Sequence, residues 1–314
     1  MPYSKASIMT LPLSSDTRAL APTPATSSAP AASQALDAGS VETPYRTQRR
    51  FDRAARLFTE PGLEALMNAR VLVVGCGGVG SFAAEALARS GVGHLVLIDF
   101  DKVCITNSNR QLHAMKGTIG KLKVEVMAER LRLIHPTSDV VAEPHFYNAE
   151  NADALLAGQV DFVVDCIDNM TAKAHLVATC LARGIPVVSS MGAAARLDPT
   201  QIRVGDLCDT EIDPFAKAFR KLLRKHHDID VQRGEPIGVR AVYSVEVPRE
   251  PAPLAYDEGQ GFVCVCPGGK NGLNDCDKKN RIDGSAAFVT GAFGLAAASV
   301  VVRALVEGRP AAAC

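Results

Sequence analysis

The 314-residue sequence has no excess of charge of either sign. Lys and Arg together number 34, and Asp and Glu also number 34, so the formal net charge is zero. This balance excludes a polycation, although it leaves room for a locally basic face. The overall charge therefore does not by itself indicate a partner.

A secretory signal is also lacking. Residues 1–13 contain one Lys and no convincing apolar core, so we expect the protein not to be exported and to reside in the cytoplasm. In that compartment the nine cysteines would remain reduced thiols. This expectation excludes a small domain held together by disulfides.

No C-x-x-C pair occurs among these cysteines. The nearest pattern is Cys264-Val265-Cys266 followed at a distance by Cys276, with Cys208 earlier in the chain. Three thiolates and an unidentified fourth ligand could hold a metal, but C-x-C with a long gap is a poor zinc pattern. Non-ligating thiols are the favoured interpretation, and a zinc site is the alternative.

The composition, 47% hydrophobic and 22% charged, fits a soluble globular protein. Residues 1–44 differ from the rest because they are rich in Ala, Pro, Ser and Thr and show no apolar period. They cannot bury enough apolar surface to offset their ordering entropy, so we predict a disordered tail. Order is expected to begin near an amphipathic helix at 49–58, followed by a helix that Pro61 opens.

From residue 69 onward, apolar runs alternate with helix-like segments. The runs predicted as strands are 71–74, 95–98, 140–146, 162–166 and 187–190, and the predicted helices between them are 81–90, 121–134, 151–156 and 171–183. Strands that alternate with crossover helices form a mostly parallel sheet covered on both faces. We therefore predict an α/β fold of the Rossmann-like, doubly wound type.

The pattern changes after residue 198. The predicted elements there are a basic helix at 215–227, strands at 238–247 and 260–266, and a polar loop at 268–279. These segments do not repeat the strand–helix alternation, so we expect a mixed or antiparallel C-terminal extension of the sheet.

A run of 19 residues at 284–302 carries no charge. Its length reaches the lower limit for a membrane span, but it consists mostly of Ala, Gly and Val and is only mildly apolar. Small residues also suit close packing against a sheet. A buried core helix is favoured over a membrane helix.

A glycine-rich turn follows the first apolar run. Gly75-Cys76-Gly77-Gly78-Val79-Gly80 stands between the predicted strand 71–74 and a predicted helix. Gly75, Gly77, Gly78 and Gly80 would let the backbone approach a ligand, and the helix would aim free N–H groups at phosphate. Asp99 ends the next apolar run, where a carboxylate can accept hydrogen bonds from ribose hydroxyls. This pattern predicts a nucleotide site, with NAD as the default ligand.

Further motifs lie downstream. In order, the sequence reads V-G-x-G-G-V-G-S, L-I-D-F-D-x-V, N-R-Q, G-x-x-K-V and D-C-x-D-N between residues 74 and 169. This ordered set resembles the ThiF/MoeB superfamily, whose members are adenylating enzymes related to the activators of ubiquitin-like proteins. The resemblance covers about residues 50–192. It implies a single adenylation domain at 45–310, with a nucleotide-binding core at 69–192 and a substrate-side extension at 193–310.

Adenylation joins a carboxylate to the α-phosphate of ATP and expels pyrophosphate, so positioning and charge neutralisation dominate. Arg110 and Lys123 would flank the triphosphate, Asp168 would bind Mg²⁺, and Asn107 and Asn169 could donate to phosphate or ribose oxygens. By resemblance, Arg53 would reach the γ-phosphate in the partner subunit of a homodimer.

Each of these residues also has a simpler interpretation. Arg110 and Lys123 could be ordinary surface cations, and Asp168 could cap the helix that begins near residue 171. Asp101 is as well suited to a turn as to a ligand, and Arg53 could lie on a solvated helix face.

Two classes of substrate fit the superfamily. Some members activate the C-terminal Gly-Gly carboxylate of a small sulfur-carrier protein, and sulfur-transfer partners are then possible. Another branch dehydrates threonylcarbamoyladenosine beside the tRNA anticodon, and this chain resembles it most. The resemblance rests on Ile212-Asp213-Pro214-Phe215-Ala216-Lys217, a basic helix, and Val242-Tyr243-Ser244-Val245-Glu246.

Residues 217–249 support the RNA alternative. They hold eight Lys or Arg against four Asp or Glu, and a cationic helix could lie along phosphates. The same helix could simply be solvated. An NAD-binding module explains the glycine turn and Asp99 but leaves Arg110, Lys123 and Asp168 without a role. We therefore predict an ATP-dependent tRNA threonylcarbamoyladenosine dehydratase activity, with carrier-protein adenylation as the alternative.

Overall fold

The structure is a computed structural model that describes residues 43–252, 254, 265, 267 and 282–308. Residues 1–42 of the tail predicted to be disordered lie outside the described residues. So do nearly all of the strand predicted at 260–266, the loop at 268–279, and Cys264, Cys266 and Cys276. The last two residues of the tail prediction are described and are ordered, because Thr43 caps a helix that begins at Pro44.

One seven-stranded sheet organises the described chain. Its strands are β1 (Arg70–Val74), β2 (His94–Ile98), β3 (Asp139–Glu143), β4 (Phe162–Asp165), β5 (Val187–Ser190), β6 (Ile202–Asp206) and β7 (Val239–Ser244). They lie in the order β3-β2-β1-β4-β5-β7-β6, and every neighbouring pair is parallel except β6 with β7. The prediction of a mostly parallel α/β sheet with an antiparallel C-terminal part is confirmed.

Alternation of side chains along the strands builds two cores. Val71 and Val73 of β1 face one cluster, whereas Leu72 and Val74 face the other. All four side chains are buried because helices cover both faces of the sheet. This explains why the strand reads as an unbroken apolar run rather than as an apolar–polar alternation.

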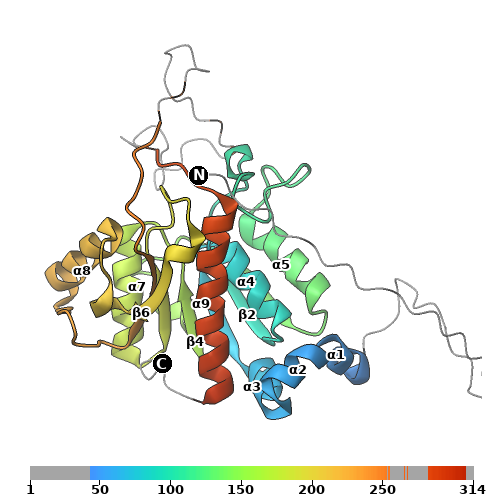
Figure 1. The fold of residues 1–314 in the computed structure, drawn as a ribbon. Helices are drawn as coiled ribbons and strands as arrows, with labels where there is room; N and C mark the ends of the chain where they lie inside the picture. Colours follow the sequence, from blue (N-terminus) through green and yellow to red (C-terminus); the bar gives the residue numbers. More distant parts are fainter. Residues whose placement is uncertain (1–42, 253, 255–264, 266, 268–281, 309–314) are drawn as a thin grey trace, which may run out of the picture. The chain divides into compact units, whose positions relative to one another are not determined.

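The helices divide between the two faces (Figure 1). They are α1 (Pro44–Arg50), α2 (Asp52–Phe58), α3 (Glu60–Asn68), α4 (Gly80–Arg89), α5 (Lys123–Ile134), α6 (Ala152–Leu155), α7 (Met170–Arg183), α8 (Pro214–His227) and α9 (Ala287–Glu307). The core of one face includes buried residues of α4, α5 and α9, and the core of the other includes residues of α6, α7 and α8. α3 packs against α9 near the start of β1.

The uncharged C-terminal segment forms α9, which lies across the sheet beside α4 (Figure 1). A Cβ at Gly294 would lie 2.3 Å from the backbone oxygen of Val79, so glycine permits this close approach. Val289, Phe293 and Ala297 are buried in the core, as expected for a core helix. Within the described residues, α9 is also the one helix long and apolar enough to cross a membrane, and 61% of its most apolar window is buried.

Two local features differ from the predictions. The helix expected at 49–58 is two helices, α1 and α2, which meet at Phe51. Phe51 is buried against the edge of the His135 ring, with ring centroids 4.7 Å apart, and this tertiary contact fixes the bend. The edge strand β6 was not predicted, because its short sequence carries Arg203 and Gly205 and has little apolar signal.

Candidate active site

The sequence-predicted residues gather mostly where the carboxyl ends of β1, β2 and β4 meet. β1 lies between β2 and β4, and the chain winds outward from β1 in opposite directions. Such a reversal opens a crevice at the carboxyl edge of a parallel sheet, which is where these folds bind ligands. The glycine turn follows β1, Asp99 follows β2, and Asp168 follows β4.

The glycine turn is tight for a physical reason. Gly75 has φ of 91°, and a Cβ there would lie 2.7 Å from the backbone oxygen of Cys166. A Cβ at Gly80 would lie 1.8 Å from the backbone oxygen of Gly75. α4 begins at Gly80, and its N-cap, Val79, offers no side-chain acceptor to the first N–H groups. The helix terminus therefore leaves donors suited to an anion.

Arg110 lies over this turn. Its Cγ is 3.3 Å from the position that a Cβ on Gly78 would take. Nη1 donates to the backbone oxygen of Thr106 and to Asn109 Oδ1, both at 2.9 Å. Burial lowers the pKa of Arg110, and nearby Asp168 opposes that shift. The structure thus brings Gly78, Arg110 and Asp168 into one neighbourhood.

Asp99 is tied into the backbone around it. Its Oδ2 accepts from the N–H of Cys76 at 2.7 Å, and its Oδ1 accepts from the N–H of Asp101 at 2.8 Å. Burial raises the pKa of Asp99, and the ammonium of Lys123 opposes that rise. Besides any contact with a ribose, this carboxylate holds the glycine turn against the end of β2.

Lys123 is not a surface cation, because its side chain is only 7% exposed. Its Nζ donates to Asp101 Oδ2 at 2.7 Å. Burial disfavours the ammonium, but Asp99 and Asp101 outweigh it and raise the pKa of Lys123 above its ordinary value. The side chain is therefore charged at neutral pH. Asp101 is its partner, a pairing that the sequence did not reveal.

The turn after β4 separates two roles that the sequence left open. Asn169, not Asp168, is the N-cap of α7, and its Oδ1 accepts from the N–H groups of Thr171 and Ala172 at 3.1 Å each. Asp168 is exposed. Its carboxylate is accessible at the carboxyl end of β4, as an ion-binding group would need to be.

Asn107 has a clear local function. It is 8% exposed, and its Oδ1 accepts from the N–H of Cys104 at 3.1 Å. This bond closes the short turn that leads to Arg110. Asn107 therefore shapes the segment beside the site, whatever else its amide group contacts.

Arg53 does not join the other residues within one chain. It is exposed on α2, which packs against α3. α3 meets the end of α9, where a Cβ on Gly62 would lie 2.9 Å from Val306, whereas Thr290 at the start of α9 lies beside Gly78. Val306 follows Thr290 by sixteen positions along α9, which corresponds to about 24 Å. The helix α2, which carries Arg53, therefore lies toward the end of α9 that is remote from Gly78 (Figure 1).

The described metal-ligating side chains near these strand ends do not form a cluster. Within the described part of the chain, no group of three or more His, Cys, Asp or Glu residues could hold a metal. A carboxylate such as Asp168 can still hold Mg²⁺ when phosphate oxygens and water complete the coordination. The residues present thus fit a magnesium ion that arrives with a nucleotide better than a permanent structural metal.

His113 is a site neighbour that sequence reasoning missed. It is fully buried, and neither ring nitrogen has a hydrogen-bond partner among the described residues. Burial, aided by the nearby Lys123 ammonium, lowers the pKa of His113 to about 3, so the ring stays neutral. A single His in a turn gives no sequence signal of this kind, because the cause is tertiary burial.

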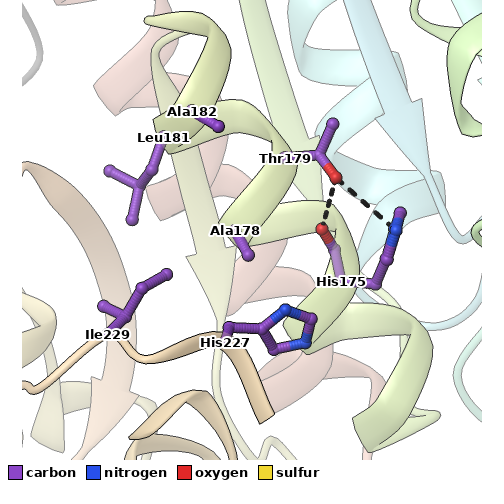
Figure 2. Close-up of a pocket in the computed structure, with 7 residues that line it drawn as sticks. All are labelled: His175, Ala178, Thr179, Leu181, Ala182, His227 and Ile229. Carbon is purple, nitrogen blue, oxygen red and sulfur yellow. Dashed lines mark hydrogen bonds between the residues drawn. The ribbon is translucent and has the colours of Figure 1, made fainter.

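A separate hollow of about 520 Å³ lies between α7 and the end of α8 (Figure 2). Its lining residues are His175, Ala178, Thr179, Leu181, Ala182, His227 and Ile229. Thr179 Oγ1 donates to the backbone oxygen of His175 at 2.7 Å. The described lining of this hollow includes none of the predicted site residues.

Comparisons with known proteins show the family and the fold. The profile of the ThiF family matches residues 51–312. The chain is 40% identical over 252 residues to the tRNA threonylcarbamoyladenosine dehydratase of Escherichia coli, covering 80% of this chain and 91% of that protein. The crystal structure of the E. coli dehydratase TcdA in complex with ATP has a TM-score of 0.72 and 35% identity, over 86% of this chain and 98% of that one.

A second kind of relative matches a shorter region. The molybdopterin-synthase adenylyltransferase of E. coli is 40% identical over 143 residues, which is 46% of this chain and 56% of that protein.

Proposed function

The chain belongs to the ThiF family, and we propose that it is an ATP-dependent dehydratase of N6-threonylcarbamoyladenosine in tRNA. The observation that carries the proposal is the set of residues that meet at the carboxyl ends of β1, β2 and β4. There the glycine turn, Arg110, Lys123 and Asp168 lie together. A dehydratase relative spans 80% of the chain, including the region beyond the nucleotide-binding core, whereas the adenylyltransferase match spans 46%.

The reaction has two steps. The threonyl carboxylate attacks the α-phosphate of ATP, forming an acyl-adenylate and releasing pyrophosphate. A neighbouring atom of the same modified nucleoside then attacks the acyl carbon, closes a ring and releases AMP. The oxygen lost from the carboxylate leaves with AMP, and the attacking atom gives up its proton as the ring closes. Relative to its neutral acid form, the nucleoside therefore loses one water in total.

The side chains of the crevice have matching roles in this proposal. Gly75, Gly77, Gly78, Gly80 and the start of α4 would receive the phosphates. Arg110 and Lys123 would neutralise the α-phosphate and the departing pyrophosphate. Asp99 would accept from the ribose, and Asn107 and Asn169 would complete the polar surroundings.

Asp168 would hold Mg²⁺, which supplies charge neutralisation at the phosphate oxygens when bound. An exposed carboxylate beside Arg110 supports this role. NAD is the weaker ligand hypothesis because a dinucleotide gives the cation pair and Asp168 no task.

The basic helix α8 supports tRNA as the substrate. Ala216, Phe219 and Leu223 bury one side of it, whereas Lys217, Lys221, Arg224 and Lys225 are exposed. An exposed row of cations on a rigid helix fits phosphates of an anticodon stem or loop. We assign the reaction to the cytoplasm, where tRNA and ATP meet.

Arg53 would complete the site across a two-fold homodimer. Its exposure, and its distance from the glycine turn within one chain, support action in the partner subunit rather than in its own. Transfer of sulfur to a partner protein belongs to the alternative, carrier-activating function.

One experiment tests the proposal directly. The purified protein is incubated with ATP, Mg²⁺ and bulk tRNA, and the nucleosides are analysed by mass spectrometry. The expected result is conversion of threonylcarbamoyladenosine to a product lighter by one water, with release of AMP. An unchanged nucleoside, together with AMP transfer to a carrier protein that ends in Gly-Gly, would support the adenylyltransferase function instead.

A further inference from the structure

A buried ion pair at the carboxyl end of β4 has no part in the steps above. Asp165 is the last residue of β4 and Lys173 lies in the first turn of α7; both are 0% exposed. Lys173 Nζ lies 2.7 Å from Asp165 Oδ2, and Ser189 Oγ donates to the same oxygen at 2.6 Å. A buried ion pair is weak evidence for stability, because desolvation offsets the attraction.

On the side of the active site, the pair stabilises the turn between β4 and α7. Asp165 Oδ1 accepts from the backbone N–H of Ile167 at 3.1 Å. Ile167 directly precedes Asp168, and Asn169 then caps α7. The Asp165 carboxylate therefore fixes the backbone from which Asp168 projects.

On its other side, the pair meets the basic helix. Lys173 Nζ lies 5.9 Å from the ring centroid of Phe215 and 5.8 Å from that of Phe219, within cation–π range. Both rings lie in the first two turns of α8, and Phe219 is fully buried. The start of α8 thus rests on the same ammonium that neutralises Asp165.

We propose that Lys173 and Asp165 are positioning residues that link α8 to the turn carrying Asp168. A polyanionic substrate held on α8 is thereby kept in one orientation relative to the nucleotide. The inference rests on the proposed function, since it assumes RNA on α8 and a metal–nucleotide complex at Asp168. Neither residue touches substrate, because both are buried beneath α8 and the turn that carries Asp168.

The test compares Lys173→Met, which removes the charge but keeps the length, with Lys173→Arg, which keeps the charge. Calorimetry measures ATP binding with and without Mg²⁺, in the absence of tRNA. Lys173→Met should bind ATP within twofold of wild type when Mg²⁺ is absent, because the Lys173 ammonium contacts Asp165, Phe215 and Phe219 and makes no described contact with the glycine turn or Lys123. The factor by which Mg²⁺ increases ATP affinity, the Mg²⁺ gain, should be at least tenfold smaller in this variant than in the wild type. Lys173→Arg should recover most of that gain.

Kinetics give the second measurement. Lys173→Met should lower kcat for dehydration at least tenfold and should raise KM for ATP in the presence of Mg²⁺, because the Mg²⁺-dependent part of the affinity is lost. If the variant folds and keeps both the wild-type kcat and the wild-type Mg²⁺ gain, the proposal is overturned. If it does not fold, Asp165→Asn/Lys173→Met removes both charges together and still allows the bond to Ile167. That double variant should keep the Mg²⁺ gain but lose at least fivefold in kcat, and wild-type kcat in it would also overturn the proposal.

Failure of the proposed function and failure of the positioning role give different experimental results. Failure of the proposed function appears as a wild-type protein that does not dehydrate the nucleoside. Failure of the positioning role appears, with a wild-type protein that does dehydrate the nucleoside, as an unchanged Mg²⁺ gain and kcat in Lys173→Met or as an unchanged kcat in the double variant.

Discussion

Single residues of the site already balance one another's charge before any ligand binds. Lys123 is paired with Asp101 at 2.7 Å, and Arg110 lies within electrostatic reach of Asp168. Asp99 is held by two backbone N–H groups. When a triphosphate binds, these cations would exchange their carboxylate partners for phosphate oxygens. The triphosphate would therefore not meet isolated charges. Such preorganised groups cost little reorganisation at the moment of reaction.

Lys123→Met tests the cation at the centre of this arrangement. Loss of the ammonium should reduce ATP consumption at least 100-fold, because the α-phosphate then loses one of its two cationic neighbours and keeps only Arg110. It should destabilise the fold by only about 1–3 kcal/mol, since its partner Asp101 is partly exposed. Lys121→Met is the matched control, because Lys121 is exposed two residues earlier and should keep wild-type turnover. Equal turnover in the two variants would remove Lys123 from the mechanism.

His113 predicts a loss of stability in acid. Its folded pKa is about 3, below the ordinary value of 6.5, so its contribution is present above pH 6.5 and declines as pH falls toward 3. At pH 5 the unfolded chain takes up this proton and the folded chain does not, which costs about 2 kcal/mol. Urea unfolding measures the free energy of unfolding at pH 8 and at pH 5. The drop between these two pH values should be smaller in His113→Gln than in the wild type by about 2 kcal/mol. An identical pH dependence in both proteins would contradict the burial argument.

At the scale of elements, the sequence was informative where local sequence patterns determine the secondary structure. Apolar runs identified β1, β2, β4 and β5, and the glycine turn marked the start of α4. It was less informative where tertiary contacts decide. β6 is an edge strand with weak apolar character, and α1 and α2 are divided by the packing of Phe51. The partners of Lys123 and Lys173 likewise depend on which turns the sheet brings together, so no spacing along the chain could reveal them.

The element that most needs testing is α8. Replacing Lys217 and Lys221 by Ala should weaken tRNA binding without changing ATP binding, because both side chains are exposed on a helix away from the glycine turn. If each contacts one phosphate, the slope of log affinity against log salt should fall by about 2 for the pair. Filter binding at several salt concentrations measures this slope. Arg303→Ala, an exposed cation on α9, is the control and should leave the slope unchanged. An unchanged slope in the α8 variant would mean that RNA lies elsewhere.

At the scale of the whole molecule, the site predicted from sequence divides into two parts. The glycine turn, Arg110, Lys123 and Asp168 share the carboxyl edge of the sheet, whereas Arg53 lies with α2 toward the other end. About 24 Å of α9 separates the two ends. A cation needed at the γ-phosphate must therefore come from a second chain if it is Arg53. In a closed two-fold dimer each subunit would then supply its Arg53 to the other.

Mixing two inactive variants decides between action within one chain and action across the dimer. Arg53→Ala and Asp168→Ala should each be nearly inactive as pure proteins. In a mixed dimer, one site combines an intact Asp168 with an intact Arg53 from the other chain, and so should be active. Random exchange of equal amounts gives intact sites for about one quarter of the total. Dehydration kinetics after subunit exchange should therefore recover toward 25% of the wild-type rate. If Arg53 acted within its own chain, every site in the mixture would still lack one residue and activity would not return, even with exchange confirmed by mass spectrometry.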